Sequence, residues 1–358
     1  MAIPALRETQ FVADLLARYE EQARDALARG AYDFIATGAG EEISQHDAVD
    51  SWRRYRLRPH VLRDVGDVDT ATTLLGIELP APIVVAPTAY HVLATPDGEV
   101  ETARGVRAAG GLMTVPTRSS VAHEDVAAAL GGAWWFQVYV SRDRDITRRM
   151  VADAKSLGAR ALVLTGDTPF VGQRPRGMTP PLTAEQFLMC FQKYLGADSE
   201  LMYATSIDPT VGLDAIAWLH AESALPVVVK GVVRGDDASA CIEAGAAAVI
   251  VSNHGGRQLD RTLASADALP DVVAAVSGRA PVLVDGGVCS GIDTLIALSL
   301  GADAVLLGRP VLWAAAAEGA AGVERLLRSL RDELAAAMAL AGVARVSQLS
   351  ADLVARRV

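Results

Sequence analysis

An imidazole, two glycines and a guanidinium follow directly on an apolar run in the segment Val249–Asp260, which reads VIVSNHGGRQLD. The apolar run predicts a parallel strand covered on both faces, so His254 and Arg257 would project beyond the end of a sheet. Histidine exchanges a proton near neutral pH, and arginine binds a carboxylate through two parallel hydrogen bonds. Together they predict a site where an acid substrate loses a proton or a hydride. A loop histidine held only by backbone groups is the alternative for His254 considered alone.

Two further charged residues end apolar runs. Lys230 follows Pro226-Val-Val-Val, and the chain contains only two other lysines, Lys155 and Lys193. A compact ammonium is therefore expected to be required there, and a lysine that merely reaches out to solvent is the alternative. Asp167, in the segment TGDTP, is expected to accept a hydrogen bond from His254 and to support its positive charge. A helix N-cap is the alternative role for Asp167.

The last two apolar runs end in the glycine-rich segments Asp285–Gly291 and Gly308–Pro310. Their backbone N–H groups, together with Arg309 and the start of a helix, suit a phosphate group. Glycines that serve only to form turns are the alternative explanation.

Eight short apolar runs alternate with segments of helical composition, which predicts an α/β fold built from serial βα units. The glycine-rich turns follow the last two runs and not the first, which favours a TIM (β/α)8 barrel over a doubly wound sheet. Active sites of such barrels lie at the carboxyl ends of the strands. The expected strands are Ile83–Ala86, Leu112–Val115, Trp135–Val140, Ala161–Thr165, Val227–Lys230, Ala248–Ser252, Val282–Asp285 and Ala304–Leu307.

We interpret residues 1–358 as a single barrel domain in which residues 1–75 form an N-terminal helical cap and lead-in. Phe11 to Ala36 has a helical period, and Tyr55 to Thr73 reads as irregular. Residues 175–210, after the fourth strand, are interpreted as a lid, with a packed helical excursion as the alternative. The apolar segment Val323 to Val343 would cover the base of the barrel or join subunits.

Composition excludes several classes of protein. The net charge is −10, so a nucleic-acid partner is not expected. Cys190, Cys241 and Cys289 have no metal-ligand spacing, which indicates a reducing compartment, no disulfides and no metal site. Met1–Gln10 lacks the features of a secretory signal, and prolines interrupt the longest uncharged stretch, so we expect a cytoplasmic protein without a membrane partner.

Lys230, the segment SNHGGRQLD and Asp285–Gly287 strongly resemble the FMN-dependent α-hydroxy-acid oxidases and dehydrogenases. Glycolate oxidase, lactate oxidase and mandelate dehydrogenase are members of this family. The resemblance runs from about Tyr32 to about Val346. It implies a TIM barrel, FMN as the cofactor, and oxidation of a 2-hydroxy acid to a 2-oxo acid with oxygen or another electron acceptor. It also favours a homotetramer.

By the same resemblance, His254 is the catalytic base and Asp167 its carboxylate partner. Arg174 and Arg257 clamp the substrate carboxylate, and Tyr139 bonds the substrate hydroxyl. An ammonium at Lys230 would balance negative charge on the flavin. The residues expected at the cofactor are Pro87, Thr88, Ala89, Thr117, Gln137, Thr165, Lys230, Ser252, Asp285, Gly286, Gly287, Gly308 and Arg309.

Four features depart from the family pattern. Phe34 stands where members commonly place a tyrosine, so one hydrogen-bond donor is lost and the pocket becomes more apolar. Arg118 stands where glycolate oxidase has a tryptophan, and it either meets a second polar or anionic group of the substrate or faces solvent. Cys289 replaces an arginine that binds the FMN phosphate in many members. The segment after Arg174 lacks the usual run of Arg, Asp and Asn.

Phe34 and Tyr90 lead us to expect an aryl or bulky 2-hydroxy acid, and Ala89 resembles the residue of members that use oxygen. Whether the α-hydrogen leaves as a proton or a hydride is open. Two alternatives accompany this reading. One is a specialised biosynthetic oxidation or an isomerisation on the same flavin barrel. The other is a flavin-binding protein that has lost activity.

Overall fold

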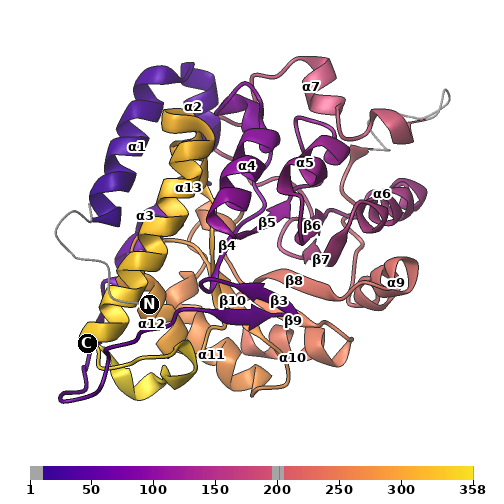
Figure 1. The fold of residues 1–358 in the computed structure, drawn as a ribbon. Helices are drawn as coiled ribbons and strands as arrows, with labels where there is room; N and C mark the ends of the chain where they lie inside the picture. The colour runs from indigo at the N-terminus through magenta and orange to yellow at the C-terminus, as the bar shows by residue number, and fades with distance from the viewer. Residues whose placement is uncertain (1–10, 196–200, 202–204, 358) are drawn as a thin grey trace.

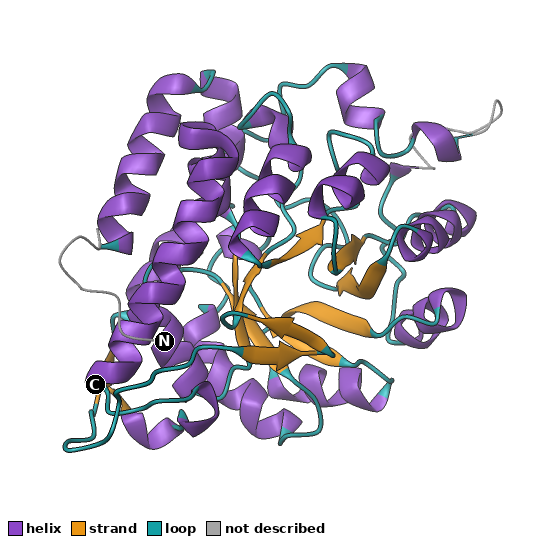
Figure 2. Ribbon diagram, viewed as in Figure 1, coloured by secondary structure: helices purple, strands orange, loops and turns teal. Residues whose placement is uncertain are grey.

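Eight parallel strands close into a barrel in the computed structural model, which describes residues 11–195, 201 and 205–357 (Figures 1 and 2). The strands follow chain order, and the last pairs back onto the first. The predicted TIM barrel is confirmed, whereas Met1–Gln10 lies outside the described residues. The strands are β4 (Ile83–Val85), β5 (Leu112–Val115), β6 (Trp134–Val138), β7 (Ala159–Thr165), β8 (Val227–Val232), β9 (Ala248–Val251), β10 (Val282–Asp285) and β11 (Ala304–Leu307).

A helix follows each barrel strand and packs outside it, as a right-handed βα crossover requires. Between β7 and its helix lies the long insertion, which contains α7 (Ala184–Leu188) and the 3-10 turn η2 (Gln192–Tyr194). The surrounding helices are α4 (Glu99–Ala109), α5 (His123–Leu130), α6 (Arg144–Ser156), α9 (Asp214–Ser223), α10 (Gly235–Glu243), α11 (Ser265–Val276), α12 (Gly291–Ser299) and α13 (Arg309–Leu340).

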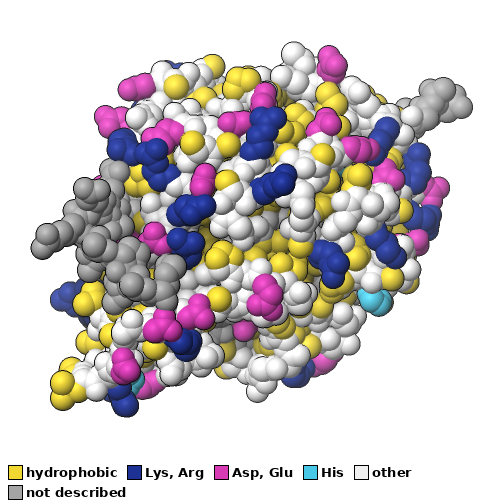
Figure 3. All heavy atoms as spheres, viewed as in Figure 1, with side chains coloured by type: hydrophobic (Ala, Val, Ile, Leu, Met, Phe, Trp, Pro, Cys, Tyr) yellow, Lys and Arg dark blue, Asp and Glu magenta, His cyan; other side chains and the backbone are white. Residues whose placement is uncertain are grey.

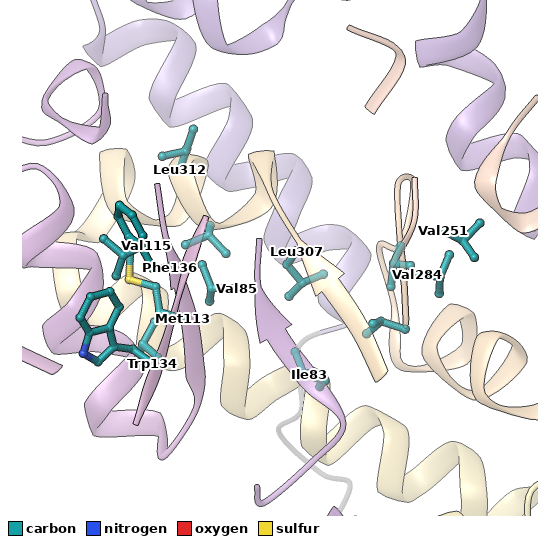
Figure 4. Close-up of a cluster of buried hydrophobic side chains, with 14 of the residues drawn as sticks. Ile83, Val85, Met113, Val115, Trp134, Phe136, Val251, Val284, Leu307 and Leu312 are labelled. Carbon is teal, nitrogen blue, oxygen red and sulfur yellow. The ribbon is translucent and has the colours of Figure 1, made fainter. Parts of the chain in front are cut away.

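The core has two apolar layers because neighbouring residues of a strand point to opposite faces. Inside the barrel, Val84 packs with Leu283 and Leu306. Outside it, Ile83 and Val85 join the layer beneath the helices, which Figure 4 shows in part. Both faces of each strand are thus buried, which explains why the strands read as continuous apolar runs.

Three helices precede the barrel, namely α1 (Val12–Ala26), α2 (Arg29–Ala36) and α3 (Ile43–Trp52). The helical structure expected over Phe11 to Ala36 is confirmed, but extended backbone at Leu27 and Ala28 divides it into α1 and α2. α1 packs along α13, so two helices far apart in the sequence lie side by side (Figure 1).

The lead-in to the barrel is also more regular than expected. β1 (Tyr55–Leu57) pairs with β12 (Val354–Arg356) near the C-terminus. β2 (Thr72–Leu74) and β3 (Ile77–Leu79) form a hairpin whose Leu74 and Leu79 enter the apolar cluster inside the barrel. The hairpin thereby covers the amino-terminal ends of the strands and leaves the carboxyl ends for the site.

The apolar C-terminal helix α13 packs against α4, α1 and α12. A role of Val323 to Val343 in joining subunits stays a prediction. Basic and acidic side chains are interspersed on the face that Figure 3 shows. Within the described part of the chain, no helix is both long and apolar enough to cross a membrane.

Candidate active site

A cavity of about 1010 Å³ opens at the carboxyl ends of the barrel strands. Strand ends, the cap helices α1 and α3, the start of α13 and the 175–210 insertion line it. Four of the predicted site residues, Asp167, Thr117, Thr165 and Ser252, are not part of its lining. Those that line it are His254, Tyr139, Lys230, Arg174, Arg257, Phe34, Tyr90, Arg118, Pro87, Thr88, Ala89, Gln137, Asp285, Gly286, Gly287, Gly308 and Arg309.

A left-handed turn presents His254 to this cavity. His254, Gly255 and Gly256 have φ values of 59°, 63° and 72°, and the Asn253 side chain accepts a hydrogen bond from the Gly256 amide. His254 Nδ1 lies 3.0 and 3.2 Å from the two carboxylate oxygens of Asp167. The N-cap alternative for Asp167 is therefore wrong. With Nδ1 donating to Asp167, Nε2 of His254 is left as the atom that can accept a proton.

Residues that the sequence reasoning missed hold Asp167 in place. Gln258 donates to Thr168 Oγ1 at 2.6 Å, and that hydroxyl donates to Asp167 at 3.1 Å. Gly231 has φ 105°, and a Cβ there would lie 2.5 Å from Asp167 Cγ, so only glycine permits the approach. In the sequence, the only sign of this requirement is that Gly231 directly follows Lys230. Burial alone would raise the pKa of Asp167, but the charges of His254 and Lys230 hold it below its ordinary value.

Lys230 is almost fully buried, with 4% of its side chain exposed, so the solvent-reaching alternative is wrong. Its ammonium lies 2.8 Å from Asp285 Oδ2 and donates to Ser252 Oγ at 2.7 Å. The same hydroxyl accepts the backbone N–H of His254 at 3.0 Å. Burial alone would lower the pKa of Lys230, but Asp285 and Asp167 outweigh it and raise that pKa, so the ammonium stays charged.

Gln137 forms a buried polar wall between β5 and β7. Its amide oxygen accepts from the Thr117 backbone at 3.0 Å, and its amide nitrogen donates to Thr165 Oγ1 at 3.0 Å. Thr117 and Thr165 therefore fix the orientation of Gln137, and their direct contact with the cofactor stays a prediction.

The two arginines expected to clamp a carboxylate have different surroundings. Arg174 Nε is buried without a protein partner among the described residues, and its guanidinium lies 4.9 Å from the centre of the Phe34 ring. Arg257 instead donates to the backbone oxygens of Phe34, Ile35 and Thr37 at the end of α2. Burial lowers the pKa of both guanidinium groups. Arg174 is thus the freer of the two for a carboxylate, and Arg257 also anchors the cap.

Aromatic side chains wall one end of the cavity. The Tyr90 ring lies 6.2 Å from Phe34 and 5.9 Å from Phe187 of α7, between ring centres. Arg118 is half-buried over Phe187 and donates to the Thr205 carbonyl at 3.0 Å, so the solvent-facing alternative is wrong. Burial, above all, raises the pKa of Tyr139, so its phenol stays protonated.

The glycine-rich turns lie at the other end. Gly287 has φ 77°, and a Cβ there would lie 2.0 Å from the Ala48 carbonyl of α3. Arg309 is held by the carbonyls of Gly255 and Ala36, at 2.8 and 3.3 Å. Gly287 is therefore required by the packing of α3 as well as by the turn, and both Gly287 and Arg309 line the cavity.

The sequence matches the model of a family described as FMN-dependent dehydrogenase over residues 23–356. The chain belongs to this family. It is 41% identical to human 2-hydroxyacid oxidase 2, over 95% of this chain and 97% of that protein. It is 41% identical to the L-lactate oxidase of a Nostoc species, over 93% and 96%. A crystal structure of mandelate oxidase superposes with a TM-score of 0.86 at 40% identity, covering 96% of each chain.

This family member is an enzyme that uses FMN to oxidise 2-hydroxy acids. FMN also occurs in a related structure, a mandelate oxidase variant with a C4a-OH-FMN adduct. The residues present fit the group. Buried Asp285 Oδ1 has no partner among the residues that the structure describes and suits a hydroxyl donor, while Gln137 and Lys230 offer the polar groups that a heteroaromatic ring needs. Among the described residues, no group of His, Cys, Asp and Glu is placed to hold a metal ion.

Proposed function

We propose that this enzyme oxidises a bulky, aryl-bearing 2-hydroxy acid to the corresponding 2-oxo acid and passes the electrons to dioxygen. The substrate loses two electrons and two protons, and dioxygen gains them to become hydrogen peroxide, so the reaction balances without a further reactant. Bound FMN supplies the two-electron acceptor. The observation that carries the proposal is the convergence of Arg174, His254 and an aromatic wall in one cavity.

Each reacting group of the substrate has a matching side chain. Arg174, with its buried unpartnered Nε, binds the carboxylate, and Arg257 adds positive charge beside it. Tyr139 donates to the substrate hydroxyl. His254 Nε2 takes a proton, and Asp167 stabilises the imidazolium that results. Lys230 places a fixed positive charge behind the cofactor site.

The walls around the substrate favour a large side chain. Phe34 brings no hydroxyl into the carboxylate site, and Tyr90, Phe187 and Met178 continue the apolar lining. A small substrate such as glycolate would leave this surface in contact with water, whereas an aryl group would bury it at about 25 cal/mol per Å². A mandelate oxidase variant whose structure is described with (S)-mandelic acid is a relative at 39% identity that supports this choice.

An anaerobic substrate screen tests the proposal. Bleaching of the flavin absorbance is followed after rapid mixing with glycolate, lactate and mandelate. Mandelate is expected to bleach it fastest. Fast bleaching by glycolate alone would show that the proposal of a bulky substrate is wrong. Turnover of none of them would favour the specialised oxidation or isomerisation.

The electron acceptor is tested in the oxidative half-reaction, in which the reduced flavin is reoxidised. Ala89 lines the cavity, and the oxidases among the relatives favour dioxygen. Reoxidation in air is expected to outpace reoxidation by a quinone dye. Faster reoxidation by the quinone dye than by air would instead indicate a dehydrogenase. A cytoplasmic location and a homotetramer remain predictions, the second of which light scattering tests.

A further inference from the structure

The part of the cavity beside the glycine-rich turns lacks one cation that a phosphate site of this family commonly has. Cys289 stands at that position, at the turn that leads into α12. Burial raises the pKa of its thiol to about 11, so Cys289 is neutral at physiological pH. Arg309 remains, but two backbone carbonyls already share its guanidinium. Asp50 and Glu20 also line this part and would repel a phosphate dianion.

Arg53 lines the same part of the cavity, as the C-cap residue directly after α3. α3 is held against the glycine-rich turn, because Trp52 Nε1 donates to the Gly286 carbonyl at 2.8 Å. The missing Cβ of Gly287 lets the Ala48 carbonyl approach as well. The charge of Arg53 reaches this region, since it opposes the burial that raises the pKa values of Cys289 and Asp293.

The present partner of Arg53 is weakly bound and can be exchanged. Its Nη1 lies 2.9 Å from Asp50 Oδ1, and the two side chains are 72% and 64% exposed. Exposed pairs of this kind contribute little to stability, so a doubly charged phosphate competes easily for the guanidinium. Long, exposed arginine side chains also reorient at little cost.

We propose that Arg53 is the phosphate-binding cation that replaces the arginine missing at position 289. The cation is thereby supplied by the N-terminal cap helix instead of the turn after β10. This inference concerns how FMN is held and does not depend on which 2-hydroxy acid is oxidised.

The test compares two flavins that differ only in the phosphate. The full-length chain, freed of bound flavin, is titrated with FMN and with riboflavin, and dissociation constants are taken from the quenching of flavin fluorescence. Arg53→Ala is expected to weaken FMN binding about tenfold and to leave riboflavin binding unchanged, because only FMN presents the dianion. Arg29→Ala is the matched control, since Arg29 is also exposed on the cap and pairs with an aspartate.

A rescue variant makes the test sharper. In the Arg53→Ala background, Cys289→Arg should restore most of the FMN affinity, because it returns a cation to the turn itself. An unchanged FMN affinity in Arg53→Ala would overturn the proposal. Equal weakening of FMN and riboflavin would overturn it too, since that pattern indicates a disturbed cap and not a lost phosphate contact. An equal loss of FMN affinity in Arg29→Ala would show that any positive charge on the cap has this effect, and the proposal would be rejected.

Discussion

Replacing Asp167 with asparagine should slow substrate oxidation while leaving the shape of the site intact. Asparagine is nearly the same size and its amide oxygen can still accept the bond from His254 Nδ1. The change therefore removes one negative charge and little else. Because Asp167 does not line the cavity, neither substrate nor flavin is expected to lose a direct contact.

The magnitude follows from the separation of the two groups. At 3.0 Å and an effective dielectric constant near 20, a carboxylate stabilises an imidazolium by about 5 kcal/mol. The side chains of His254 and Asp167 are 25% and 15% exposed, so solvent screening reduces this to about 3 kcal/mol. If positive charge develops on His254 in the transition state, the loss corresponds to about a 100-fold lower rate.

The assay is the rate of anaerobic flavin bleaching at saturating substrate, with flavin content checked by the resting absorbance. Thr168→Val is the matched control, because it removes the hydrogen bond that the Thr168 hydroxyl donates to Asp167 at 3.1 Å, together with the bond from Gln258, and keeps the charge of Asp167. We expect that control to lose about threefold. A rate for Asp167→Asn within about fivefold of the wild type would refute the assignment of a charge-supporting role.

Four further outcomes are expected. Arg174→Ala should raise KM about 100-fold, with Arg174→Lys intermediate, as measured by steady-state kinetics, because a buried charge-assisted pair with the carboxylate is lost; an unchanged KM would exclude Arg174 from the clamp. Lys230→Met should lower the free energy of unfolding by about 3 kcal/mol in denaturant titrations, and adding Asp285→Asn should recover part of it, since the first change leaves a buried carboxylate unpaired. The pKa of Lys230 is raised in the folded protein, so its ion pair contributes fully to stability below the unfolded pKa of about 10.4. This contribution is lost as the pH rises through the pKa of the folded protein. Unfolding curves at about pH 8 and about pH 11 measure the loss. Phe34→Tyr should shift the ratio of kcat/KM for glycolate over mandelate upward about tenfold, because it adds a donor beside Arg174; no shift would remove Phe34 as a specificity residue.

The barrel was predictable because its strands are buried on both faces and therefore read as uninterrupted apolar runs. The bounds of β5, β10 and β11 agree with the expected ones. His254 and Lys230 were predictable as well, since each lies at or just after the end of such an apolar run. Local sequence thus carries the information wherever the positioning element and the functional group are adjacent in the chain.

Contacts between distant segments could not be predicted in this way. Arg257 binds carbonyls at the end of α2, far earlier in the chain, and no local pattern indicates that partner. The hairpin of β2 and β3 was missed because its strands are three residues long and pair only with each other. The need for glycine at position 231 becomes clear only once Asp167, in the loop just after the neighbouring strand β7, is placed beside it.

α1 packs on α13, and both α1 and α3 line the cavity. Binding of the cofactor is therefore coupled to the docking of these first helices on the barrel. A ligand that contacts both the cap and the barrel favours the state in which they are docked, by the ordinary thermodynamics of linkage. Loss of flavin would then loosen the amino-terminal segment before the barrel itself melts, and a protease would meet that segment first.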